Sequence, residues 1–141
     1  MILRYSTTIK GASLPQPAYS NDSGVDITAL QLIKKIGSNT FMYDTGICIS
    51  PPEGYYTMLV ARSSIVKTGY MLSNSVGILD ASFRGSLKIV LTRVDDTLPE
   101  LQLPFTVCQL VLMPLVNPIP KLVVNLDETV RGDREFGSSN K

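Results

Sequence analysis

Asp80 is the residue of this chain best placed to act as a base, because it stands between two apolar runs. Val76–Leu79 precedes it, and in Leu87–Leu91 apolar residues alternate along the chain with the period of two of a strand that has one buried face. Two strands folded about Asp80 would hold its carboxylate against apolar side chains, and partial desolvation makes a carboxylate more basic. An alternative is that Asp80 caps a hairpin turn and pairs with Arg84, since aspartate favours turns.

The sequence contains no histidine. This excludes Ser-His-Asp and Cys-His catalysis as well as zinc bound by histidine. Carboxylates would therefore have to transfer the protons in any reaction. A bound metal would be a hard cation held by oxygen atoms, which indicates magnesium.

Two further polar side chains lie within predicted strands. Asp26 alternates with Val25 and Ile27, so its side chain points to the face opposite the apolar ones. Gln109 is the exception in the otherwise apolar run 105–115, and a buried amide must find hydrogen-bond partners. Each residue is either structural, on a solvated strand face or as a hydrogen-bonded link, or part of a polar site.

The segment Arg62–Gly69 predicts the only helical turn, with Ser63 and Ser64 at its start and a glycine after its end. Unpaired N–H groups at a helix start, next to an arginine and two hydroxyls, favour an anion. The alternative is an ordinary capped helix with Arg62 in solvent.

The last segment, 131–141, is polar and cannot bury a core of its own. Chain ends of this composition are usually frayed. However, Arg131, the single aromatic Phe136 and the Gly-Ser-Ser run 137–139 are the groups that could close over a phosphorylated ring compound. We therefore expect residues 1–130 to form one domain and residues 131–141 a flexible arm over the active site.

Composition sets the class of protein. A chain of 141 residues with 44% hydrophobic and 18% charged residues is one globular domain. Its formal net charge of +1 argues against a general nucleic-acid or membrane-surface binder. Without a signal pattern or a long apolar span, we expect a cytoplasmic protein, in which Cys48 and Cys108 are buried thiols rather than a disulfide.

Many short strands separated by turn signals predict an all-β fold with one short helix, either a sandwich or a barrel. The expected strands are residues 1–5, 25–29, 40–43, 47–49, 55–61, 76–79, 87–91, 105–115 and 122–126.

Five segments, taken together and in this order, resemble the motifs of the trimeric dUTPase family: Asp22–Ile27, Ala61–Ser64, Ser75–Gly85, Cys108–Val111 and Arg131–Ser139. The resemblance covers nearly the whole chain. It implies a distorted, jelly-roll-like β-barrel of the β-clip type, a homotrimer with shared active sites, and hydrolysis of dUTP to dUMP and pyrophosphate with Mg²⁺ on the triphosphate.

The resemblance also implies roles for individual residues. Asp80 matches the aspartate that activates the attacking water, and Phe83 matches the aromatic residue under the deoxyribose. Asn74 and Gly77 match the uracil-reading hairpin, while Asp26 and Gln109 match positions that hold the water ligands of magnesium. The matches to the phosphate clamp and to the lid over uracil are Arg62, Ser63, Ser64, Arg131, Phe136, Gly137, Ser138 and Ser139.

The chain departs from the family pattern at three places. Position 83 is usually tyrosine, and phenylalanine keeps the steric plate without the hydroxyl. Leu103–Cys108 replaces the turn and arginine that usually precede Gln109. Arg134 and Glu135 stand where glycines are common, so the arm should be stiffer.

Two other functions are compatible with such a scaffold. A dCTP deaminase would need a catalytic glutamate in the strand after Asp80, but the corresponding residue is Val90. A binding or regulatory protein would not need turnover, yet the residues that turnover requires are present.

Overall fold

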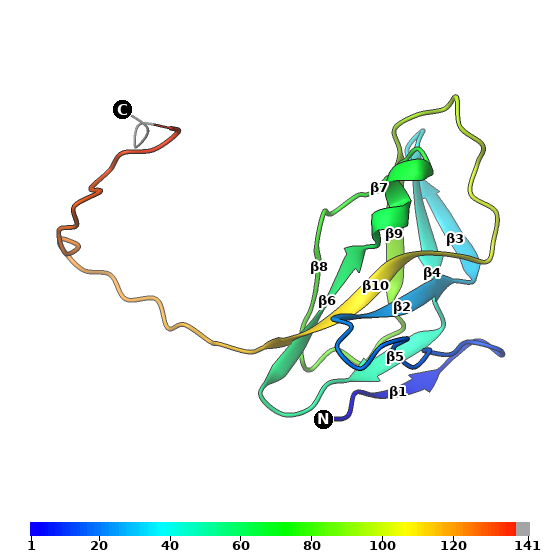
Figure 1. Cartoon of the computed structure of the whole chain (residues 1–141), viewed down its shortest axis with the longest axis horizontal. Coiled ribbons are helices and arrows are strands. Elements are labelled where there is room, and N and C mark those ends of the chain that lie inside the picture. The colour runs from blue at the N-terminus through cyan, green and yellow to red at the C-terminus, as the bar shows by residue number, and fades with distance from the viewer. Residues whose placement is uncertain (138–141) are drawn as a thin grey trace.

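The computed structural model describes residues 1–137. Its strands form three antiparallel sheets, and the described strands do not close into a single hydrogen-bonded barrel (Figure 1). The first sheet pairs β1 (Arg4–Thr7) with β5 (Ile47–Ser50). The second has the order β2 (Gly24–Ala29), β10 (Phe105–Pro114), β6 (Tyr55–Ala61) and β8 (Gly77–Leu79). The third has the order β3 (Gln31–Ile36), β4 (Thr40–Asp44), β9 (Lys88–Arg93) and β7 (Tyr70–Leu72).

The core lies between the two four-stranded sheets. Ile27 from the second sheet and Ile89 and Leu91 from the third have no exposed surface. The rings of Tyr43 and Phe105 meet edge to face across this space, with centroids 4.9 Å apart. Burial raises the pKa of Tyr43 to about 12. Each fully buried aliphatic side chain contributes roughly 1.5–3 kcal/mol to stability, so these contacts hold the two sheets together.

Both cysteines are free thiols. Cys108 is fully buried in β10, and this burial raises the pKa of its thiol to about 12. The expectation of thiols rather than a disulfide is confirmed, but the expected burial holds for Cys108 only, because Cys48 on β5 is half-buried.

The predicted hairpin about Asp80 is wrong. The strand before Asp80, β8, pairs with β6 in the second sheet, whereas β9 pairs with β4 and β7 in the third. The segment between them is therefore a connection from one sheet to the other. Its far end was predicted correctly, since Leu87, Ile89 and Leu91 are all buried.

The helical turn is a 3-10 helix, η1 (Ser63–Lys67), rather than an α-helix. Its N-cap residue is Arg62, and no side chain caps it, so the expected serine cap is not formed. The helix lies beside β10 and β7 and places Arg62 at the end of β6.

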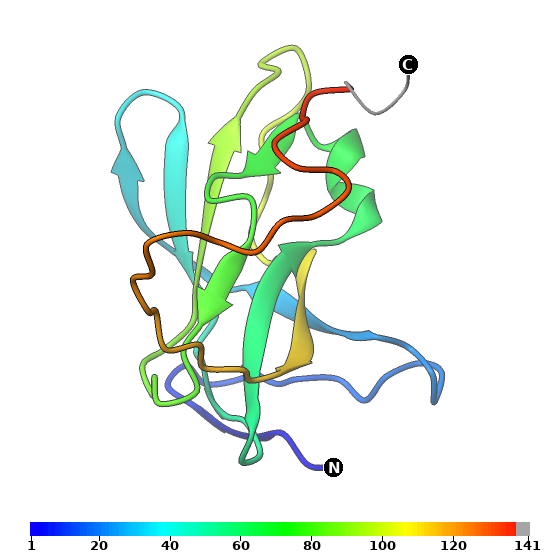
Figure 2. The same ribbon diagram turned by 90° about the vertical axis from the view of Figure 1, so that its left-hand side faces the viewer.

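The predicted last strand, residues 122–126, is absent from the described chain. Leu122 and Val124 are 99% and 96% exposed, although their alternation with polar neighbours has the period of a strand. A strand needs a partner for its backbone and for its apolar face, and this segment has neither. It extends to one side of the sheets in Figure 1 and passes in front of them in Figure 2, so it leads away from the body.

Within the described residues, no helix has the length and apolar character needed to cross a membrane.

Candidate functional site

Four of the predicted site residues face one pocket of about 500 Å³. They are Asp26 on β2, Gln109 on β10, and Arg62 and Ser63 at the start of η1. The loop 15–18 and the segment 22–25 complete the lining. Residues that are far apart in the sequence meet here because β2 and β6 flank β10 in the second sheet.

Asp26 and Gln109 are neighbours across the β2–β10 ladder. The Gln109 side chain donates from Nε2 to the carbonyl oxygen of Ala61, 3.2 Å away. Its Oε1 lies directly over Gly24, where an added β-carbon would be only 2.0 Å away. Gly24 thus makes room for the amide, and the expected hydrogen-bond partner of Gln109 is confirmed.

Arg62 is held on two sides. Its Nε is 3.0 Å from Oδ1 of Asp26, and one terminal nitrogen donates to the carbonyl oxygen of Thr106 at 3.0 Å. The alternative interpretation required Arg62 to be free in solvent, and these two contacts contradict it. Both partners of the ion pair are more than a third exposed, and such pairs are weak, so an anionic ligand can compete for the guanidinium.

Ser63 lines the pocket, and Ser64 follows it in η1. The Ser64 hydroxyl is buried and has no hydrogen-bond partner among the described residues. Ser64 does not line the pocket, so in this conformation its hydroxyl is not placed to contact a ligand there.

Asp80 lies outside this pocket, in the connection between β8 and β9. Its backbone oxygen accepts from Phe83 N at 3.0 Å, which forms a tight turn. The carboxylate is exposed, so the expected apolar surroundings are not provided by one chain. The expected pair with Arg84 is also not formed, because that guanidinium donates to the carbonyl oxygens of Ala81 and Phe83.

Asn74 and Gly77 border the turn that leads into β8. Ser75 adopts a left-handed conformation with φ of 62°, and Val76 N donates to Asn74 O at 2.6 Å. A β-carbon on Gly77 would approach Leu59 to 3.3 Å and the Asn74 amide to 3.5 Å. The turn is therefore tightly packed on β6, and only a small residue fits at Gly77.

The structure of one chain does not bring the C-terminal residues to the pocket. Phe136 is 96% exposed, and Arg131 donates to the carbonyl oxygen of Arg134 in its own segment. Gly137 is also exposed, while Ser138 and Ser139 lie outside the described residues.

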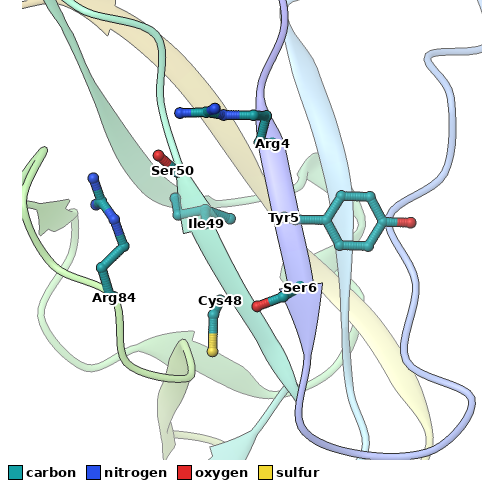
Figure 3. Close-up of a pocket in the computed structure, with 7 residues that line it drawn as sticks. All are labelled: Arg4, Tyr5, Ser6, Cys48, Ile49, Ser50 and Arg84. Carbon is teal, nitrogen blue, oxygen red and sulfur yellow. The ribbon is translucent and has the colours of Figure 1, made fainter.

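A second groove, of about 270 Å³, was not predicted from the sequence (Figure 3). Arg4 on β1 and Arg84 in the connection after Asp80 lie on either side of it, and Cys48 and Ser50 of β5 contribute to its lining. It carries no motif residue except Arg84, and the exposed β1 gave no periodic signal that could have revealed it.

Comparison with known proteins gives a consistent result. A family model described as dUTPase matches residues 10–140. A deoxyuridine 5'-triphosphate nucleotidohydrolase of Ehrlichia canis is 33% identical over 135 residues, covering 90% of this chain and 88% of that protein. The corresponding protein of Escherichia phage T5 is 36% identical over 101 residues, covering 71% of this chain and 68% of its own.

The fold agrees with solved structures. A dUTPase of Staphylococcus bacteriophage 80alpha, a G164S mutant with dUpNHpp, matches with a TM-score of 0.77 and 23% sequence identity. The match covers 98% of both chains. At this identity the likeness supports the fold: a nearly all-β, jelly-roll-like architecture.

Proposed function

The chain belongs to the dUTPase family, and we propose that it hydrolyses dUTP to dUMP and pyrophosphate through a water molecule activated by Asp80. As a dUTP nucleotidohydrolase, the protein is a hydrolase that acts on a phosphoanhydride. The observation that carries the proposal is the pocket in which Asp26, Arg62, Ser63 and Gln109 meet. Phosphoryl transfer depends on positioning and on neutralising charge, and these groups are suited to both.

The triphosphate is assigned to the Arg62 side of the pocket. The Arg62 guanidinium and the Ser63 hydroxyl are donors for phosphate oxygens, and Ser64, whose buried hydroxyl does not line the pocket, would have to turn toward it to join them. In the free protein the Asp26 carboxylate pairs with Arg62. When the ligand binds, this carboxylate would leave the guanidinium and face the water ligands of the magnesium ion instead.

Magnesium is assigned to Asp26 and Gln109, held through water molecules. The donor set fits, because it offers a carboxylate and an amide oxygen, and the Gly24 backbone leaves Gln109 Oε1 room beside the pocket. Mg²⁺ is typically held by one or two carboxylates, waters and substrate phosphates rather than by a full protein cage. When bound, it would neutralise charge on the phosphate oxygens.

Asp80 is the proposed general base and also contacts the 3′-OH of the deoxyribose. It takes a proton from the water whose oxygen attacks the α-phosphorus, the bond from that phosphorus to the bridging oxygen breaks, and pyrophosphate leaves. The carboxylate is exposed and therefore accessible, and the bound nucleotide would supply the desolvation that a single chain lacks.

The uracil is assigned to the turn at Asn74 and Gly77, and the deoxyribose to Phe83. The tight packing of Gly77 on Leu59 supports a narrow base site that has no space for the methyl group of thymine. The Phe83 ring is 45% exposed, so it is available as a plate for the sugar.

The remaining residues are proposed to come from other copies of the chain in a homotrimer. Arg131, Phe136, Gly137, Ser138 and Ser139 would form the arm that closes over a pocket between two neighbouring subunits. The exposed apolar side chains that precede this arm support the proposal, because the described residues of their own chain do not cover them. They are Val116, Ile119, Leu122, Val124, Leu126 and Val130.

The direct test is pyrophosphate release, measured in parallel with dUTP, dCTP, dTTP and UTP. Only dUTP should give a strong signal, and a chelator should abolish it. Equal turnover of dTTP or UTP would contradict the assigned base and sugar sites. Ammonia release from dCTP would favour the deaminase instead.

Asp80→Asn tests the role of the carboxylate. Turnover should fall by about 10²–10⁴-fold, while binding of a non-hydrolysable dUTP analogue is kept, because only the proton acceptor is lost. Near wild-type turnover would reject Asp80 as the base.

A further inference from the structure

The connection that carries Asp80 and Phe83, residues 80–87, has no regular secondary structure and joins two different sheets. Strand pairing therefore fixes only its ends. Three internal hydrogen bonds give it a shape: Phe83 N to Asp80 O, and the Arg84 guanidinium to the carbonyl oxygens of Ala81 and Phe83. None of these bonds attaches the connection to the rest of the fold.

The external attachment is made by Asp44, the last residue of β4. Its Oδ1 accepts hydrogen bonds from the Ser86 hydroxyl and from Gly46 N, the latter at 2.9 Å. Lys88 completes the group, with Nζ 3.7 Å from Asp44 Oδ2 and donating to Ser86 O at 3.0 Å. We call Asp44, Ser86 and Lys88 the loop clamp.

The backbone beside the clamp is fixed as well. Leu87 N donates to Ile47 O at 2.8 Å, and Leu87 O accepts from both the backbone N–H and the hydroxyl of Thr45. The far end of the connection therefore rests on the turn between β4 and β5. Within the described chain, Ser86 Oγ to Asp44 is the one hydrogen bond that a side chain of residues 80–86 makes to another element, and Lys88 Nζ adds a bond to the Ser86 carbonyl oxygen.

The clamp can act on the site because the path from Ser86 to Asp80 is short and closely packed. A β-carbon on Gly85 would lie 2.6 Å from Cζ of the Phe83 ring, so the ring rests on the residue next to Ser86. The backbone N–H of Phe83 in turn donates a hydrogen bond to the backbone oxygen of Asp80. A shift of Ser86 would therefore act on the Phe83 ring and on the backbone of Asp80.

From this geometry we propose that the loop clamp positions Asp80 and Phe83 for hydrolysis, with Asp44 and Ser86 as positioning residues that do not touch the substrate. The inference rests on the proposed function for its kinetic consequence, but not for its structural one. Misplacing reacting groups by about 1 Å can lower a rate by about 10²-fold, so loss of the clamp should act on turnover more than on binding.

The test compares Asp44→Ala, which removes the acceptor of the clamp, Ser86→Ala and Ser86→Thr with the control Asp95→Asn. Asp95 accepts hydrogen bonds from the backbone N–H and hydroxyl of Thr97, so it has similar chemistry in another loop. We expect kcat to fall by about 10–100-fold in Asp44→Ala and Ser86→Ala. The Kd for an imido analogue of dUTP should change by less than about threefold, and Ser86→Thr and Asp95→Asn should stay within about twofold of wild type.

The double variant Asp44→Ala/Ser86→Ala should be no slower than Asp44→Ala alone, because Asp44→Ala already removes the acceptor of the Ser86 hydrogen bond. Hydrogen exchange of the amides of residues 81–85 should be faster in Ser86→Ala than in wild type, and unchanged in Asp95→Asn. This measurement needs no substrate. If the wild-type protein did not hydrolyse dUTP, the proposed function would fail, and exchange alone would decide on the clamp. Unchanged exchange, or a Ser86→Ala kcat within about twofold of an active wild type, would overturn it.

Discussion

Phe83 and Gly85 depend on each other at the scale of single residues. The ring occupies the space in which a β-carbon of residue 85 would stand, at 2.6 Å from Cζ. Because the ring is exposed, Gly85→Ala would not break the core but would push the ring away from its place.

Gly85→Ala should therefore weaken discrimination against the 2′-OH. We expect the ratio of kcat/KM for dUTP over UTP to fall by about 10-fold, within the range that a single steric contact provides. The matched control is Gly37→Ala, in the β3–β4 turn, where a β-carbon meets nothing within 4 Å although φ is +70°. Equal loss of selectivity in both variants would contradict the role of the ring.

The sequence predicted which polar residues gather in the pocket better than it predicted the surroundings of Asp80. Asp26, Arg62, Ser63 and Gln109 come from distant parts of the sequence and line one pocket, while their roles stay predictions. The environment of Asp80 was wrong, because the pairing of β8 with β6 depends on contacts distant in sequence. Ser86 and Asp44 were missed for the same reason: an Asp-Thr-Gly turn is typical of any hairpin, and only the fold shows what its carboxylate binds.

At the scale of elements, the attachment of the 80–87 connection to β4 should depend on pH. Burial raises the pKa of Asp44, but hydrogen bonds from Ser86 and Gly46 and the charge of Lys88 outweigh it, so the pKa lies below its ordinary value. A carboxyl with a lowered pKa stabilises the fold above its unfolded pKa of about 3.9, and this contribution is lost as the pH falls through the folded pKa.

Asp44→Asn should consequently lower the free energy of unfolding at pH 7, and the difference from wild type should shrink as the pH falls below about 4. Urea unfolding at a series of pH values measures this difference. A gap of constant size down to the acid limit would show that the charge of Asp44 is not what stabilises the connection.

Periodicity predicted some elements well. The expected strand 55–61 coincides with β6, and the alternation of Leu87, Ile89 and Leu91 marked the buried face of β9. The strand β3 was missed because all its residues are exposed, so its sequence has no buried face to reveal it. The predicted strand at 122–126 is absent from the described chain. Alternating apolar residues indicate that a segment can pair with another strand, but they do not identify that strand.

A chain that ends at Val130 should separate the role of the arm from that of the fold. Residues 131–137 are exposed, so the free energy of unfolding should change by less than about 0.5 kcal/mol. Affinity for dUTP and turnover should nevertheless fall sharply, because the proposed lid is gone. Normal hydrolysis by the truncated protein would rule out the lid.

The whole molecule consists of a packed body and a segment that leads away from it. The apolar side chains of this segment, such as Leu122, Val124 and Val130, are almost fully exposed. Large exposed apolar surfaces mark sites of association, which agrees with the proposed homotrimer. Sedimentation should accordingly give three times the chain mass of 15.4 kDa.

Because the arm lies away from the packed body of its own chain, it can contact the pocket of another chain. Asp80→Asn subunits keep the arm 131–141, and subunits that end at Val130 keep Asp80. Mixed assemblies would therefore contain some pockets that combine an intact Asp80 from one chain with an intact arm from another. Co-refolding the two variants should thus give faster dUTP hydrolysis than either variant alone. A mixture that is no more active than its components would mean that the arm does not act on the pocket of another chain.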